Sequence, residues 1–322
     1  MTTLDASIVI CTHDRAQVVG TAVRGALAAA RDAAAEVIVV DNASSDATPA
    51  VLDELARAEP ALRVVRHETL GLSAARNRGL AEARGRIVVY LDDDAVPHPG
   101  WLPALLEPYA HPVVACVGGP LVLRFEGTPP SWLTSAFHPA AGAFDLGPSP
   151  RTLTTRPGDF FPCGANISFR RETAIALGGF STLVGAHGRQ QMTHEETDLC
   201  ARITRSGHQV RYVPTAVVDH WVVADKLTPR YFLSRQLRFG QSTAIYLLRN
   251  RSLLRVLIGA RWYLRLLLRA PYEPHDPIDP ERLLAECQRR EALGYLGSLA
   301  RNLPKLARLR TDEPLARPSL PA

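Results

Sequence analysis

Short β-branched runs alternate with alanine-rich helical segments through the first 95 residues of this 322-residue chain. The pattern predicts strands at 6–11, 36–41, 62–66 and 86–91, with helices at 15–31, 47–58 and 72–83. Such alternation is typical of βαβ units, which form a parallel sheet with helices packed on its faces. The sequence therefore predicts an α/β fold with a mostly parallel, Rossmann-like sheet.

Polar residues follow three of these predicted strands at the point where each strand ends. Residues 12–15 read Thr-His-Asp-Arg, residues 41–46 read Asp-Asn-Ala-Ser-Ser-Asp, and residues 92–94 are three aspartates. Ligands of open α/β sheets bind at the carboxyl ends of the strands. We therefore expect the binding site at this edge.

The pattern changes after residue 95. Residues 96–160 are rich in proline and glycine, with strand-like runs at 113–117 and 120–125, and we expect them to shape an acceptor site. Order returns over 161–222, with a helix predicted near 172–177 and a strand at 210–213.

These patterns predict a division into domains. A catalytic domain spans 1–225, with a nucleotide-binding half over 1–95 and an acceptor half over 96–225. A helical extension over 226–302 and a flexible, Pro- and Arg-rich tail over 303–322 follow.

Cysteine usage and charge exclude several classes of protein. The five cysteines are odd in number and form no C-x-x-C pair, which fits reduced thiols in the cytoplasm and argues against a structural zinc site. No secretory signal and no run of about 18 apolar residues are present, so no membrane-spanning helix is predicted. The net charge of +5 comes without an RNA- or DNA-reading motif, so we predict no nucleic-acid partner.

Two common nucleotide-binding motifs are absent from the sequence. The first predicted strand continues into Cys-Thr-His-Asp-Arg-Ala-Gln, which lacks the glycines of G-x-G-x-x-G, and no G-x-x-x-x-G-K-[ST] occurs. We therefore expect neither NAD chemistry nor P-loop ATPase chemistry.

Asp92, Asp93 and Asp94 point to a divalent cation. Adjacent carboxylates repel one another unless a cation lies between them, and oxygen ligands suit Mg²⁺ or Mn²⁺ carrying a diphosphate. A solvated acidic turn or a helix N-cap is the alternative, since Pro97 and Pro99 follow. The position after the fourth predicted strand favours the cation site.

Two further pairs have both a ligand-binding and a structural interpretation. Asp41 and Asn42 are placed to accept hydrogen bonds from a base or ribose, and turn chemistry explains the serines after them. Arg76 and Asn77 fall on a predicted helix near the sheet edge, where an arginine pairs with phosphate. A surface arginine is the alternative for Arg76.

The segment from His194 to Asp198 begins like the zinc motif H-E-x-x-H but lacks the second imidazole. A general base within the acidic cluster or an acidic helix start are the two interpretations that remain. His220 follows a predicted strand and is either a structural histidine or a ligand of a divalent ion.

Taken in order, these motifs resemble family 2 glycosyltransferases of the GT-A fold. The resemblance covers roughly residues 5–222 and rests on SIVICTHDR, VVDNASSD, GLSAARNRG, YLDDD, GANISFRR, GGF, EETDLCAR and the late His220. It implies an inverting transferase that uses a nucleotide-diphosphate sugar (UDP, GDP or dTDP type) and Mg²⁺ or Mn²⁺.

The resemblance also implies roles for individual residues. Those near the nucleotide or donor sugar are Thr12, Asp14, Arg15, Asp41, Asn42, Arg76, Asn77, Asp92, Asp93, Gly164 and Asn166. Asp94, Asp92 and His220 would hold the metal, with Asp94 ending a D-x-D motif. Glu196 stands where the family usually has its catalytic aspartate, with Glu195 and Asp198 as rivals for the base.

Two other functions compete with glycosyl transfer. A nucleotidyltransferase would carry a Gly-rich loop with Arg and Lys after the first strand, which residues 12–18 lack. A sugar-nucleotide-binding scaffold without turnover is the second rival. The acceptor is open among a sugar, a lipid-linked glycan and a small natural product.

The segment 228–270 is predicted to be helical and basic. Nine arginines and no acidic residue lie between Lys226 and Tyr272, and five of the arginines share one arc of a helix. We expect a helix that packs its apolar side on the catalytic domain. Peripheral contact of 249–270 with an anionic inner membrane surface is the alternative.

Overall fold

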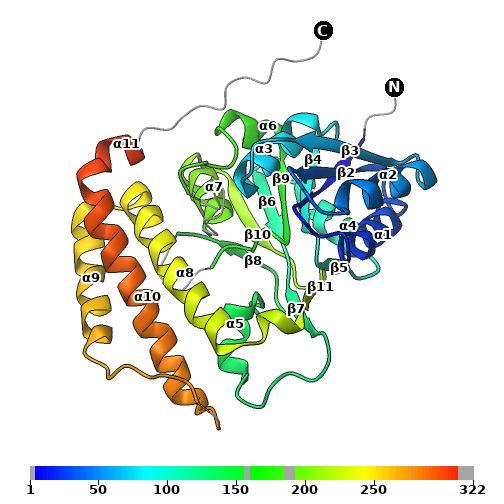
Figure 1. Ribbon diagram of the computed structural model, residues 1–322. Coiled ribbons are helices and arrows are strands. Elements are labelled where there is room, and N and C mark those ends of the chain that lie inside the picture. The colour runs from blue at the N-terminus through cyan, green and yellow to red at the C-terminus, as the bar shows by residue number, and fades with distance from the viewer. Residues whose placement is uncertain (1–3, 156–159, 185–192, 276, 311–322) are drawn as a thin grey trace.

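The computed structural model describes residues 4–155, 160–184, 193–275 and 277–310. Figure 1 shows a central sheet with helices on both faces and a layer of long helices beside it. The strands are β1 (Ala6–Thr12), β2 (Ala35–Asn42), β3 (Leu62–His67), β4 (Ile87–Asp92), β5 (Ala95–Pro97), β6 (Val114–Gly118), β7 (Leu121–Phe125), β8 (Arg151–Leu153), β9 (Asn166–Arg170), β10 (Gln209–Tyr212) and β11 (Val218–Val222). The α-helices are α1 (Val19–Ala30), α2 (Thr48–Ala58), α3 (Leu72–Glu82), α4 (Trp101–Leu106), α5 (His138–Ala141), α6 (Arg171–Ala176), α7 (Glu195–Arg205), α8 (Pro229–Asn250), α9 (Leu253–Leu267), α10 (Pro280–Asn302) and α11 (Leu306–Arg310).

The central sheet has eight strands in the order β3-β2-β1-β4-β9-β6-β10-β8. The first four are parallel, as the sequence predicts, and β9 runs antiparallel to both β4 and β6. A second sheet has the order β5-β11-β7 and pairs His220 with Ala95. His220 therefore lies within a strand rather than after one, directly beside the aspartates that end β4.

The parallel half of the sheet is buried on both faces. Ile8, Val9 and Ile10 of β1 are inaccessible to solvent, as expected for parallel strands covered by helices. In Figure 1, α1, α2 and α4 lie on one side of the sheet and α3, α6 and α7 on the other. The helix predicted at 15–31 begins only at Val19. A turn precedes it, in which the Val18 N–H donates to the Arg15 carbonyl at 3.1 Å and the Arg15 N–H donates to the Thr48 hydroxyl at 2.8 Å.

Helices α8, α9 and α10 form the adjoining layer, and α8 and α10 run in the same direction (Figure 1). Their backbones meet at Gly240 and Gly294. A Cβ on Gly240 would lie 2.0 Å from the carbonyl oxygen of Glu291, so a side chain there would force the helices apart. The predicted helical segment 228–270 is two helices, with a break in which Arg251 is extended.

The helical layer is joined to the sheet domain by an aromatic cluster. Trp132, Phe137 and Phe232 pack edge to face with ring centroids 5.5–5.7 Å apart. The predicted flexible tail at 303–322 begins with a 3-10 turn and α11, and its residues 311–322 lie outside the described residues. Within the described ranges, no helix is both long and apolar enough to span a membrane.

Candidate active site

Three aspartates mark the carboxyl end of β4. Asp93 and Asp94 are buried, and the Thr12 hydroxyl at the end of β1 donates to Asp93 Oδ2 at 2.7 Å. Burial and the neighbouring Asp94 raise the pKa of Asp93 to about 7. The parallel ends of β1 and β4 therefore hold a crowded group of carboxylates, as the sequence predicts.

Cationic side chains from two distant segments converge on Asp94. His220 Nε2 lies 3.2 Å from Asp94 Oδ1, and Lys226 Nζ donates to Asp94 Oδ2 at 3.0 Å. Arg15 Nη2 lies 3.7 Å from the same oxygen as Lys226. Burial would raise the pKa of Asp94, but hydrogen bonds and charge from His220 and Lys226 outweigh it and hold that pKa well below its ordinary value.

Arg76 is buried and connects β4 to the start of α7. Its guanidinium donates to Glu195 Oε1 at 2.7 Å and to Asp92 Oδ1 at 3.3 Å, and it lies 3.8 Å from Glu196 Oε2. Burial lowers the pKa of Arg76, but these carboxylates raise it above its ordinary value. A Cβ on Gly164 would lie 2.1 Å from Arg76 Nη2, so the absence of a side chain at Gly164 makes room for the guanidinium.

This environment separates the two interpretations of Arg76. A surface position is wrong, because the residue is only 3% exposed. Its charge is shared among three carboxylates, so it orients them in the site.

Glu195 and Glu196 open α7, where negative charge is favoured by the helix dipole. The Glu195 side chain is almost fully enclosed, whereas that of Glu196 is 16% exposed. Burial and the adjacent Glu196 raise the pKa of Glu195 to about 8. Oε2 of each glutamate is buried without a hydrogen-bond partner among the described residues. A buried carboxylate oxygen without a hydrogen bond costs free energy, so these two oxygens call for a partner that the described residues do not supply.

Asp198 does not join this group. Its side chain is 0% exposed, and its oxygens accept hydrogen bonds from Arg202 Nε at 2.9 Å, Arg249 Nε at 3.0 Å and Asn250 Nδ2 at 2.8 Å. The residue thus ties α7 to the end of α8.

Three asparagines expected near the nucleotide or donor use their side-chain amides within the protein. Asn42 accepts from Gly71 N and donates to the carbonyls of residues 67 and 69. Asn77 is bonded through both amide atoms to the backbone of Phe180. Asn166, fully buried, binds Trp101 Nε1 and two carbonyl oxygens. Each amide therefore fixes the neighbouring backbone through hydrogen bonds within the protein.

The loops after β1 and β2 are bonded to each other. Asp14, whose φ of 51° is left-handed, accepts from the backbone N–H of Ser45 at 2.7 Å. That hydrogen bond lowers the pKa of Asp14. Asp41 is buried, and its oxygens accept from Arg66 and from the backbone N–H of Ser44. These hydrogen bonds fix the conformation of the two loops that are predicted to bind the base.

Lys226 is a site residue that the sequence interpretation missed. The sequence contains only two lysines, Lys226 and Lys305. A lysine in such an arginine-rich sequence could have marked position 226 as a candidate site residue. Its contact with Asp94 joins positions 132 residues apart, which no local pattern reveals.

The donor set of this site fits a divalent metal held partly by its substrate. Asp92, with its side chain 37% exposed, and Asp94 offer carboxylate oxygens, and His220 turns its Nε2 atom toward Asp94 at 3.2 Å. No group of three or more His, Cys, Asp or Glu side chains in the described part of the chain is arranged to hold a metal alone. Mg²⁺ and Mn²⁺ are commonly bound by one or two carboxylates plus substrate phosphates.

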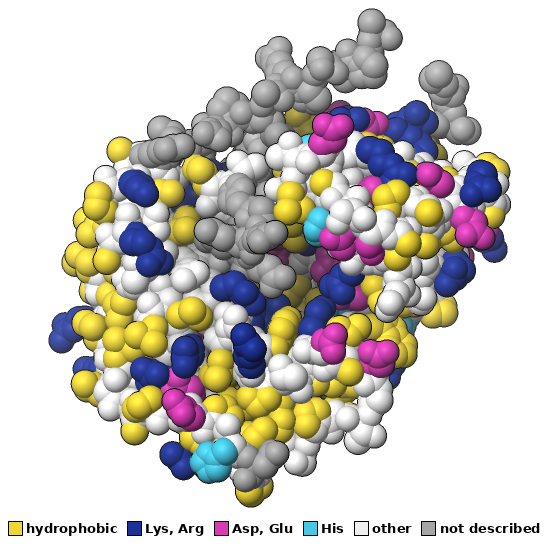
Figure 2. Space-filling model, viewed as in Figure 1, with side chains coloured by type: hydrophobic (Ala, Val, Ile, Leu, Met, Phe, Trp, Pro, Cys, Tyr) yellow, Lys and Arg dark blue, Asp and Glu magenta, His cyan; other side chains and the backbone are white. Residues whose placement is uncertain are grey.

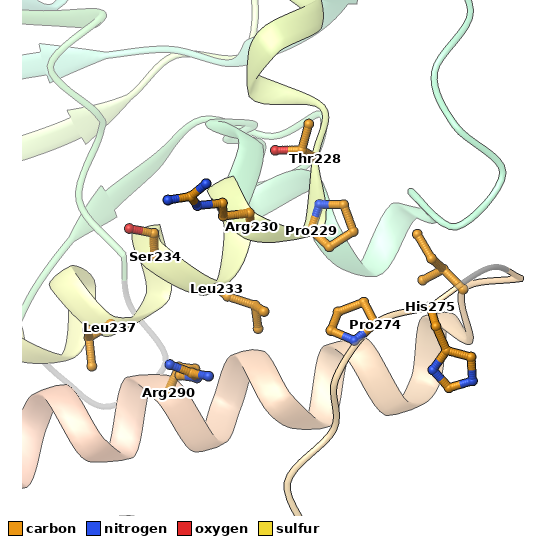
Figure 3. A pocket seen from close by; sticks show the side chains of 10 residues that line it. Thr228, Pro229, Arg230, Leu233, Ser234, Leu237, Pro274, His275 and Arg290 are labelled. Carbon is orange, nitrogen blue, oxygen red and sulfur yellow. The ribbon is translucent and has the colours of Figure 1, made fainter.

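A cavity of about 580 Å³ lies at the start of α8. Figure 3 shows Arg230 and Leu233 on α8 and Arg290 on α10 around it, with Pro274 and His275 on the connecting chain. The lining is apolar with cationic edges.

The family described as Glycosyl transferase family 2 matches residues 7–178, more than half of the chain. The protein belongs to this family. The glycosyltransferase class predicted from the ordered motifs is therefore confirmed.

Curated relatives carry glycosyltransferase names. A glucosyl-dolichyl phosphate glucuronosyltransferase of Haloferax volcanii is 28% identical over 218 residues, covering 66% of this chain and 68% of the relative. A pre-mycofactocin glycosyltransferase of Mycobacterium tuberculosis is 32% identical over 210 residues, covering 65% of this chain. The aligned part spans only 41% of the mycobacterial protein's length.

Solved structures of two glycosyltransferases share the fold. The mannosyltransferase PcManGT from Pyrobaculum calidifontis, determined with GDP-Man and Mn²⁺, aligns with a TM-score of 0.56 and 20% identity over 96% of this chain and 79% of its own. GalNAc-T7, determined with UDP, GalNAc and Mn²⁺, gives a TM-score of 0.52 and 17% identity over 94% and 58% of the two chains. These likenesses confirm the predicted GT-A fold.

Proposed function

We propose that this family 2 member moves a sugar from a nucleotide-diphosphate sugar to an acceptor hydroxyl, with a divalent metal and with inversion at the anomeric carbon. The observation that carries the proposal is the contact of Asp93 and Asp94 with Arg15, His220 and Lys226. Arg76 links this group to Glu196, because it lies 3.3 Å from Asp92 and 3.8 Å from Glu196. The cationic side chains can bind a diphosphate, and the Glu196 carboxylate can accept a proton from an acceptor hydroxyl.

Asp92, Asp94 and His220 would hold Mg²⁺ or Mn²⁺, which would supply positive charge to the diphosphate oxygens. Both solved neighbours were determined with Mn²⁺ and a nucleotide or nucleotide sugar, which supports this assignment. Arg15 and Lys226, both partly exposed, supply the protein's own cations beside it. Arg76 is committed to carboxylates, so its role is to orient Asp92 and Glu195.

Glu196 is the proposed general base. It is the most exposed of the three candidates, whereas Glu195 is paired with Arg76 and Asp198 with Arg202 and Arg249. The acceptor hydroxyl transfers its proton to the Glu196 carboxylate as its oxygen bonds to the anomeric carbon. The bond from that carbon to the diphosphate oxygen breaks, and the nucleoside diphosphate leaves. A single displacement inverts the configuration.

The acceptor is proposed by class. The names of the two relatives refer to a dolichyl phosphate and to pre-mycofactocin, which keeps lipid-linked and small-molecule acceptors as the leading classes. The cavity lined by Arg230 is the proposed acceptor approach, since Thr228 in its lining follows Lys226 by two residues along the chain. The domain division at residue 225 and a cytoplasmic location stay predictions.

The test incubates the protein with UDP-glucose or GDP-mannose, Mn²⁺ and an acceptor panel, and follows release of the nucleoside diphosphate. We expect the product anomer, assigned by NMR, to be inverted relative to the donor. Glu196→Gln should slow transfer by about 10²- to 10⁴-fold, and the exposed control Glu172→Gln should not. Release of the sugar 1-phosphate would identify a nucleotidyltransferase, and nucleotide binding without any release would identify a binding protein.

A further inference from the structure

The outer face of α9 carries large apolar side chains in contact with solvent. We define this face by Leu254, Leu257, Ile258, Trp262, Leu264 and the following Leu268, which are between 46% and 86% exposed. Contiguous exposed apolar surface of this kind marks an interaction site. In Figure 2 it forms yellow surface with blue cationic groups along the left edge of the molecule, where α9 lies in Figure 1.

The opposite side of α9 packs against α10. The helix therefore cannot rotate to bury its outer face without losing that packing. Tyr263 stacks on Tyr295 of α10 with ring centroids 4.0 Å apart, and the Tyr295 hydroxyl donates to the Val256 carbonyl at 3.2 Å. Ala260 and Leu266 complete the buried side. This packing fixes the rotation of α9 about its axis and keeps the outer face exposed.

The charge on the outer face has one sign. Arg255, Arg261, Arg265 and Arg269 are exposed among the apolar side chains, and no acidic residue lies between Lys226 and Tyr272. A second copy of the chain would place arginine against arginine across this face. An anionic surface would complement it, and arginine stems can lie on apolar groups while their guanidinium groups reach outward.

We propose that the outer face of α9 binds the surface of an anionic phospholipid bilayer. The helix would lie in the interface, with its leucines, isoleucine and tryptophan among the acyl chains and its arginines at the lipid phosphates. The sequence predicted packing of this segment on the catalytic domain, whereas the inner side of α9 packs on α10. The membrane contact given there as the alternative is the one proposed for the outer face. The proposal does not depend on glycosyl transfer.

Sedimentation of the full chain with lipid vesicles tests it. We expect binding to vesicles of phosphatidylcholine and phosphatidylglycerol at 7:3, much weaker binding to phosphatidylcholine alone, and release as salt is raised. No donor or acceptor is present, so the result is separate from the proposed reaction. Absence of binding to the anionic vesicles at about 0.1 M salt would overturn the proposal.

Paired variants localise the contact. Arg261→Gln, Arg265→Gln and Arg269→Gln combined should weaken binding about 100-fold, since each arginine near an anionic surface contributes about 1 kcal/mol. The control combines Arg31→Gln, Arg57→Gln and Arg84→Gln, which remove the same charge from exposed sites elsewhere.

The apolar part has its own variant. Leu254→Gln with Ile258→Gln should weaken vesicle binding at least about 10-fold while leaving the melting temperature unchanged, because both side chains are exposed. Vesicle binding that is the same in all these variants would refute the assignment to α9. A dimer in sedimentation equilibrium that this apolar variant dissociates would show that a second copy covers the face instead.

Discussion

Replacing Asp198 by asparagine distinguishes a structural carboxylate from a catalytic one. The side chain is fully buried and accepts hydrogen bonds from Arg202, Arg249 and Asn250 at 2.8–3.0 Å. Asp198→Asn keeps the shape but removes the charge that both guanidinium groups share. Disrupting a buried ion pair in this way costs about 3–5 kcal/mol, and we expect a loss of unfolding free energy in that range.

Urea unfolding followed by circular dichroism measures this loss, which should lower the midpoint by about 1 M or more. Asp53→Asn is the matched control: Asp53 is paired with Arg66 at 2.9 Å but exposed, and its pair should contribute less than about 1 kcal/mol. An Asp198→Asn protein that unfolds like the wild type yet has lost transfer would refute the structural assignment and make Asp198 a rival base again.

Three further variants test the surroundings of the site. Gly164→Ala should lower activity at least about 10-fold and reduce the melting temperature, because its Cβ would overlap the buried Arg76 guanidinium; wild-type kinetics would contradict the packing. Burial raises the pKa of Glu195 from 4.5 to about 8, so stability from its neutral form is lost as pH rises through 8. Melting temperatures from pH 5 to 9 should show a smaller decline in Glu195→Gln than in the wild type, and identical profiles would argue against the shift. Lys226→Met should weaken nucleoside diphosphate binding about 10-fold in calorimetry, whereas Lys305→Met should not; equal effects would remove Lys226 from the site.

The sequence predicted the parallel half of the fold because its physics is local. Apolar runs such as Ser-Ile-Val-Ile-Cys and Ile-Val-Val-Tyr-Leu form strands that are buried on both faces. Because these strands are parallel, their carboxyl ends meet at one edge of the sheet. The gathering of Thr12, Arg15 and the three aspartates there follows directly.

The remaining parts depend on contacts between distant segments. Asp198 and Glu196 stand two positions apart on α7. Asp198 is bonded to Arg202 of the same helix, but its second arginine, Arg249, comes from α8, and no local pattern shows that contact. The same holds for Asn166, whose amide is bonded to carbonyls of residues 120 and 216. The residue types suggested ligand binding, but tertiary hydrogen bonds determined their use.

The most direct test of the account is calorimetric titration of UDP, GDP and dTDP into the protein with and without Mn²⁺. The account predicts that one of the three binds, that Mn²⁺ tightens it at least about 10-fold, and that Asp94→Asn removes this gain while the exposed control Asp32→Asn keeps it. Binding of equal strength without metal, or an unchanged metal effect in Asp94→Asn, would contradict the claim that the end of β4 holds a metal-bound nucleoside diphosphate.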